Sequence, residues 1–216
     1  MKNRLLLKET LLSEIKTLAE NRNINPQYPI TDLMVSTTES GYLEDITLNL
    51  ESCNPFPKPL LYGVNLLDGI WQLHYSTARE IRSLNKLPFG FQLQQVYQII
   101  NTQKASFFNI AFVKDSTGLI NGYVKVTATF EPKIQENETL PDDIINVNFD
   151  QRYISIQKIF GIKTPILDPF KTFNARNPQG RIPSLKITYI DESLRIGRGG
   201  DGSLFILSKQ KSMVNS

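Results

Sequence analysis

The spacing of hydrophobic residues changes once along the chain. Over residues 4–20, apolar side chains recur every three or four positions, which predicts an amphipathic helix. This stripe consists of Leu7, Leu11, Ile15 and Leu18. A weaker helical pattern covers roughly residues 31–51, and the proline-rich segment 54–59 follows, where regular structure is disfavoured because proline lacks a backbone N–H. We therefore predict a helical N-terminal cap over residues 1–53.

From residue 66 onward the pattern alternates with a period of two. Trp71, Leu73 and Tyr75 are predicted to share one face of the first strand. Further strands are predicted at 92–101, 105–114, 118–131, 144–149, 152–160, 184–191, 193–198 and 203–209. Most are joined by short turns with no helix between them, which favours an antiparallel meander, and closure into a barrel removes exposed edges. The predicted fold is mainly β (α+β): one domain over residues 1–216, with an antiparallel barrel of about eight strands at 60–210.

Two connections are long. Residues 131–143 carry five acidic side chains and are interpreted as a solvated turn. Residues 161–183 mix cations with apolar side chains, which suits a barrel lid or a contact with anionic lipid headgroups, although ordinary packing over the barrel mouth is the alternative. The cations are Lys163, Lys171, Arg176 and Arg181, and the apolar residues are Ile162, Ile166, Leu167, Phe170 and Phe173.

Composition excludes several classes of protein. A net charge of +3 over 216 residues does not by itself indicate a nucleic-acid partner. No apolar run is long enough to span a bilayer, and the N-terminus lacks the uninterrupted apolar stretch of a signal peptide. The single cysteine, Cys53, excludes an internal disulfide and is expected to be a small buried side chain near a helix end.

No catalytic or metal-binding set is recognisable. Residues 197–202 match the pattern GxGxxG, but an apolar strand follows where a dinucleotide site requires a helix, so these glycines are predicted to form a hairpin turn. His74 is the only histidine and is predicted to face away from Trp71, exposed or at a strand edge. We expect no catalytic residue, no metal and no cofactor.

Aromatic residues are spread over nearly every predicted strand, and many are expected to point into the barrel. Barrels of eight strands are either filled by side chains or hold one small ligand, and the pattern leaves both open. The candidate ligand lining, inferred from strand alternation, is Phe112, Val126, Phe130, Val147, Phe149, Tyr189 and Phe205.

Three motifs resemble the plastid lipid-associated protein family, the plant and cyanobacterial fibrillins. Residues 67–77 (LDGIWQLHYST) are similar to the family's opening strand. Residues 97–100 (YQII) with 109–111 (NIA) are similar to its central stretch. Residues 187–199 (ITYIDESLRIGRG) and 202–207 (GSLFIL) are similar to its C-terminal signature.

The resemblance implies a lipocalin-like barrel in which Gly69 and Trp71 form a G-x-W opening. In such barrels the tryptophan closes one end and a late-strand arginine packs on it, a role that Arg195 or Arg198 would fill. Trp71 is then structural rather than catalytic. The resemblance also implies lipids, carotenoids or prenyl quinones as ligands, a role at photosynthetic membranes in organisation or photoprotection, and in some members an isoprenoid-biosynthesis enzyme as partner.

Two non-enzymatic functions follow from this interpretation. In the first, the barrel binds a hydrophobic small molecule, such as a carotenoid, quinone or lipid, at a peripheral membrane surface. In the second, the barrel is filled and the protein is an adaptor that docks on membrane or on an isoprenoid-biosynthesis enzyme. The absence of a recognisable leader leads us to expect the cytoplasmic face of a cyanobacterial thylakoid, or a plastid. The N-terminal helix is expected either to pack across the barrel mouth or to lie on a bilayer.

Overall fold

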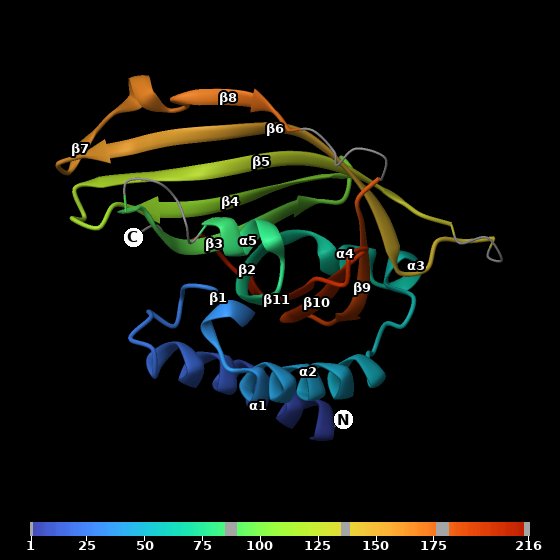
Figure 1. The fold of residues 1–216 in the computed structure, drawn as a ribbon. Coiled ribbons are helices and arrows are strands. Elements are labelled where there is room, and N and C mark those ends of the chain that lie inside the picture. Colours follow the sequence, from blue (N-terminus) through green and yellow to red (C-terminus); the bar gives the residue numbers. More distant parts are fainter. Residues whose placement is uncertain (1, 85–89, 135–138, 176–181, 214–216) are drawn as a thin grey trace.

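The computed structural model describes residues 2–84, 90–134, 139–175 and 182–213. Its centre is a closed antiparallel barrel in the order β2-β11-β10-β9-β6-β5-β4-β3, in which β3 pairs back onto β2 (Figure 1). The strands are β2 (Gly69–Ser76), β3 (Gln92–Asn101), β4 (Ser106–Lys114), β5 (Ile120–Pro132), β6 (Ile144–Ile159), β9 (Ser184–Ile190), β10 (Leu194–Gly199) and β11 (Leu204–Gln210). The predicted barrel of about eight strands is confirmed.

Three short strands join the sheet outside the barrel. β1 (Ile30–Thr31) pairs with β2 in parallel, while β7 (Ile162–Lys163) and β8 (Lys171–Asn174) both pair with β6. The prediction of two strands at 144–149 and 152–160 is wrong, because β6 runs through both and carries an irregularity between them.

The connection at 161–183 is more ordered than its sequence indicated. It contains β7, the short 3-10 helix η3 (Pro165–Leu167) and β8, which lie along the edge of the sheet farthest from the N-terminal helices (Figure 1). Arg176 and Arg181, together with part of the predicted acidic turn at 135–138, lie outside the described residues.

Helices α1 (Lys2–Glu20) and α2 (Thr37–Ser52) pack together on the outer wall of the barrel, below β10 and β11 (Figure 1). Ser36 and Glu39 form a capping box that fixes the start of α2. The predicted apolar stripe of α1 is buried between the helices and strands β2, β9, β10 and β11. The packing interpretation of α1 therefore holds, although the helix covers the barrel wall rather than its mouth.

The barrel has separate inner and outer cores. The inner core holds Trp71 and Leu73 of β2, with apolar side chains from β3, β4, β5, β6, β9 and β11, while β10 adds the guanidinium of Arg195. The outer core holds Tyr75 and Tyr189 beneath the helices. Short helices α3 (Pro59–Tyr62), α4 (Val64–Leu67) and α5 (Arg79–Leu84) add side chains to the inner core, so they cover openings that the strands leave.

Two bulges transfer tyrosines from the inner face to the outer face. In β2, Leu73 pairs with Leu207 while Tyr75 pairs with Ile206, so His74 is an extra residue. The prediction that Tyr75 shares a face with Trp71 is therefore wrong. A similar shift around Thr188 in β9 turns Tyr189 outward while Ile187 and Ile190 remain inside.

Candidate functional site

Trp71 lies where β2 enters the barrel. Its side chain is fully buried, and Nε1 donates a hydrogen bond of 2.8 Å to the carbonyl of Leu67, at the end of α4. Lys209 Nζ donates to the neighbouring carbonyl of Leu66 at 2.9 Å and lies 5.2 Å from the centre of the Trp71 ring. Both side chains thus satisfy carbonyl groups that a helix end leaves unpaired, and they fasten α4 over this end of the barrel.

Gly69 makes room for this arrangement. Its φ of +113° is strained for any residue with a side chain, and a Cβ there would lie 3.3 Å from Lys209 Cε. The glycine of the G-x-W opening therefore lets the lysine stem pass close to the backbone on its way to α4.

Arg195 is the arginine that packs on Trp71. Its guanidinium carbon lies 5.0 Å from the indole centre, and only 3% of the residue is exposed. Nη2 donates to Gln98 Oε1, and Gln98 Nε2 donates to Asn109 Oδ1 at 2.9 Å. Burial lowers the pKa of Arg195, and no carboxylate pairs with it anywhere in the described part of the chain. A buried cation is thus held by an aromatic face and a chain of amides.

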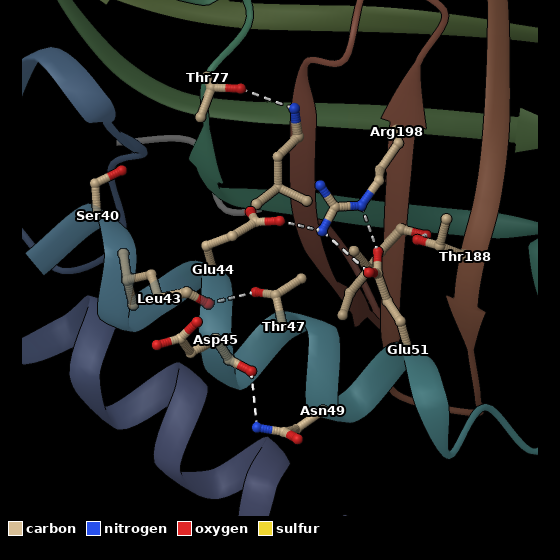
Figure 2. Close-up of polar contacts among 12 residues, drawn as sticks. Ser40, Leu43, Glu44, Asp45, Thr47, Asn49, Glu51, Thr77, Thr188 and Arg198 are labelled. Atoms are coloured by element: carbon tan, nitrogen blue, oxygen red, sulfur yellow. Dashed lines mark hydrogen bonds and ion pairs between the residues drawn. The ribbon is translucent and has the colours of Figure 1, made fainter. Parts of the chain in front are cut away.

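Arg198 has a different role. It points away from Trp71 and binds two carboxylates of α2: Nη2 lies 2.7 Å from Glu44 Oε1, and Nε lies 2.8 Å from Glu51 Oε1 (Figure 2). These contacts raise the pKa of the Arg198 guanidinium, chiefly through its hydrogen bond to Glu51. Of the two arginines that the sequence offered for closing the barrel, Arg195 does so and Arg198 anchors α2.

A second ion pair anchors α1. Lys8 Nζ lies 2.6 Å from Asp191 Oδ2, in the turn between β9 and β10, and Tyr189 donates to the same oxygen at 2.7 Å. Burial by itself would raise the pKa of Asp191, but the hydrogen bonds from Lys8, Tyr189 and the backbone N–H groups of Ser193 and Leu194 lower it to about 2. This carboxylate in the β9–β10 turn therefore fixes a helix.

The candidate lining residues divide between the two faces. Phe130, Val147, Phe149 and Phe205 belong to the inner core with Trp71. Val126 pairs with Asn109, the last amide of the chain that begins at Arg195, so the register places it on the inner side. These five remain a predicted lining.

Two lining assignments are wrong. Phe112 alternates with the inward Ala111 and Val113, and packs outside the barrel with its ring centre 6.2 Å from that of Tyr97 and 6.3 Å from that of Tyr123. Tyr189 faces the helices because of the bulge at Thr188.

Of the two positions that the sequence allowed for His74, exposed or at a strand edge, the structure excludes the exposed one. Its ring is partly buried, and Nε2 lies 2.7 Å from Ser208 Oγ. Burial lowers the pKa of the imidazole to about 4. The folded protein therefore keeps His74 neutral over a pH range in which the unfolded chain binds a proton.

Lowering the pH from 7 toward 4 should therefore destabilise the fold through His74. Below its ordinary pKa near 6.5, the unfolded chain binds a proton that the folded chain excludes until about pH 4, so stability falls across this window. The slope approaches about 1.4 kcal/mol per pH unit, and the whole window contributes about 3 kcal/mol. Denaturant titrations at several pH values measure it. Because the sequence has one histidine, His74→Gln should flatten the curve between pH 6.5 and 5, and an unchanged slope in that variant would refute the assignment.

Cys53 is exposed at the end of α2, which overturns its predicted burial, and its Sγ donates to the carbonyls of Asn49 and Leu50. Among the described residues, no three histidine, cysteine or acidic side chains gather in the manner of a metal site. None of the described helices has the length and apolarity to cross a bilayer.

Exposed apolar residues are concentrated on the edge formed by β7, η3 and β8. Ile166 is 92% exposed and Ile162 is 71% exposed. The other members of this edge are Phe160, Phe170 and Phe173. We call these five residues the apolar edge. The sequence marked this segment by its mixture of apolar and cationic residues, but it did not indicate that strand pairing to β6 would present them to solvent.

Comparison with known proteins identifies relatives. The chain is 28% identical to the chromoplast-specific carotenoid-associated protein of Cucumis sativus, over 83% of this chain and 63% of that protein. It is 25% identical to plastoglobulin-1 of Pisum sativum, over 80% and 55% respectively. It is 28% identical to a light-induced chloroplastic protein of Solanum tuberosum, over 82% and 62%. The chain thus spans less than two thirds of the length of these relatives.

The family model PAP_fibrillin matches residues 33–208, which include α2, the barrel up to the last two residues of β11, and the apolar edge. This range also contains Trp71, Arg195 and the two carboxylate partners of Arg198. The chain belongs to the PAP/fibrillin family of plastid lipid-associated proteins.

Proposed function

We propose that this protein is a non-enzymatic, peripheral lipid-associated protein that carries a hydrophobic small molecule, such as a carotenoid, prenyl quinone or lipid. It acts at a photosynthetic membrane, on a thylakoid surface or within a plastid, in membrane organisation or photoprotection. The relatives named for carotenoids and plastoglobules support the class of ligand. The observation that carries the membrane role is the apolar edge, with Ile166 almost fully exposed.

The apolar edge suits a lipid surface because its isoleucine and phenylalanine side chains are exposed in the folded chain. Transfer of one such side chain into an acyl layer contributes about 1.5–3 kcal/mol. Lys163 and Lys171 lie within the same segment and would remain at headgroup level, as cations do at membrane interfaces. The helices α1 and α2 lie on the opposite side of the barrel and stay clear of the membrane in this orientation (Figure 1).

Replacing Ile166 with serine should weaken vesicle binding about tenfold, for neutral and anionic vesicles alike, because an apolar contact is lost. The fold should be unaffected, since the side chain is 92% exposed. Co-sedimentation with vesicles measures the change. Ile134→Ser is the matched control, because Ile134 is an exposed isoleucine outside the apolar edge. Equal binding by the Ile166 variant and the native protein would reject this contact.

One observation favours the adaptor as a second candidate. The inner core already contains apolar side chains from every barrel strand except β10, including Trp71, Phe107 and Ile187, and Arg195 of β10 occupies part of the interior. In that case, the protein docks on membrane or on an isoprenoid-biosynthesis enzyme without an internal ligand. Extraction of the purified protein for apolar molecules distinguishes the two candidates.

A further inference from the structure

A row of lysines crosses four neighbouring strands on the outer face of the sheet. Lys114 of β4 pairs with Asn121 of β5, Asn121 pairs with Lys158 of β6, and Lys158 pairs with Lys163 of β7. Directly paired residues point to the same face, and adjacent strands lie about 4.8 Å apart. Three lysines and one asparagine therefore share one face of four neighbouring strands.

The row borders a pocket of about 480 Å³ that is open to solvent. Its lining includes Phe112 and Gly122, together with Thr164, Pro165 and Asp168 in and beside η3. Gly122 keeps the strands close here, since a Cβ would lie 2.2 Å from the carbonyl oxygen of Ser155. Lys114 passes over Gly118, where a Cβ would lie 3.0 Å from Lys114 Cε.

The pocket carries a positive net charge, and one buried polar atom in its lining lacks a hydrogen-bond partner. Within the described residues, none of its three lysines forms an ion pair. The lining contains one carboxylate, Asp168, which accepts a hydrogen bond from Tyr123, so the charged groups sum to three positive and one negative, a net +2. The Oδ1 atom of Asn121 is buried without a hydrogen-bond partner. The pocket thus offers charge to an anion and an acceptor to a hydroxyl group.

The residues next to the pocket indicate the chemical class of its ligand. Lys163, Thr164 and Pro165 line the pocket, and Ile162 and Ile166, beside them in sequence, are members of the apolar edge. A molecule that fills the pocket therefore has an apolar surface next to it. A lipid meets both requirements, with its headgroup among the lysines and its acyl chains against the isoleucines.

We propose that this pocket binds the headgroup of an anionic membrane lipid, one that carries a phosphate or sulfonate together with free hydroxyl groups. The anionic group lies among Lys114, Lys158 and Lys163, and a hydroxyl group donates to Asn121. This inference rests on the proposed membrane role and adds to it a choice among lipids: the apolar edge gives affinity for any bilayer, and the pocket selects anionic ones.

The test uses the full chain and three kinds of vesicle: neutral galactolipid alone, or galactolipid with a minor fraction of phosphatidylglycerol or of sulfoquinovosyl diacylglycerol. The native protein should bind both anionic kinds at least about tenfold more tightly than the neutral kind, because each lysine near an anionic surface contributes appreciably. The double variant Lys158→Gln/Lys163→Gln should lose this preference and keep its binding to neutral vesicles. Lys104→Gln/Lys133→Gln removes the same charge from exposed lysines outside the pocket and should keep the preference.

Each other outcome has a definite meaning. Equal binding of the native protein to neutral and anionic vesicles overturns the headgroup site but leaves the membrane role intact. If both double variants lose the preference for anionic vesicles equally, the headgroup site is also overturned, because the preference then reflects the net charge of the protein. Failure of the folded native protein to bind any vesicle rejects the proposed membrane role itself. Binding of soluble glycerol 3-phosphate as tightly as anionic vesicles would assign the pocket to a free phosphate and overturn the lipid as its ligand.

Discussion

Replacing Trp71 with alanine should lower the free energy of unfolding by about 3–5 kcal/mol, the range for removing a large, fully buried aromatic side chain. The loss has three parts. The cavity left in the inner core is the largest, the hydrogen bond to Leu67 is lost, and Arg195 is left buried without its aromatic partner.

Thermal and denaturant unfolding followed by circular dichroism measure this change, and the melting temperature should fall by on the order of 10 °C. Tryptophan fluorescence can follow the unfolding of the native protein but not of this variant, because Trp71 is the sole tryptophan. Trp71→Phe should lose less, since the ring still fills much of the cavity and faces Arg195. A decrease below about 1 kcal/mol in Trp71→Ala would show that the barrel end is not held by this residue.

Replacing Phe130 with aspartate should reduce uptake of a carotenoid or quinone at least about 100-fold, because a carboxylate on the inner face must lose its hydration when an apolar ligand enters. Phe130 packs on the inner core, with its ring centre 6.3 Å from that of Phe107. Titration of the purified protein with ligand, followed by absorbance, measures the affinity.

Two further variants separate a binding effect from a folding effect. Phe160→Asp adds the same charge at a position that is 70% exposed, on the apolar edge, and should leave uptake in solution unchanged. Phe130→Leu keeps an apolar side chain, so it should fold and retain most of the uptake. A folded Phe130→Asp protein with native affinity would remove Phe130 from the lining.

The barrel was predictable because most strands alternate regularly and are joined by short turns. Alternation failed where one extra residue enters a strand. Nothing in the sequence around His74 or Thr188 distinguishes a bulge from a regular strand, yet each bulge moves a tyrosine from the inner face of the barrel to the outer face beneath the helices. The error at Phe112 is of a different kind, since its neighbours Ala111 and Val113 are also apolar and leave the inward face ambiguous.

Long-range contacts were the least predictable part of the structure. The partners of Arg198 lie 147 and 154 residues away in α2, and Lys8 meets Asp191 across 183 residues. The lysine row depends on the pairing of four strands, including β7, which the sequence did not indicate. From the sequence, the arginine that packs on Trp71 could be predicted only as Arg195 or Arg198. The choice between them depends on which side chain points into the barrel.

The most direct test of a hydrophobic ligand is native mass spectrometry, with organic extraction, of the protein purified from a photosynthetic host. The proposed function predicts a carotenoid, quinone or lipid in near-stoichiometric amount, lost from the folded Phe130→Asp protein and retained by Phe160→Asp. A protein from the same host that carries no apolar molecule, yet still binds membrane or an isoprenoid-biosynthesis enzyme, would contradict the carrier and establish the adaptor.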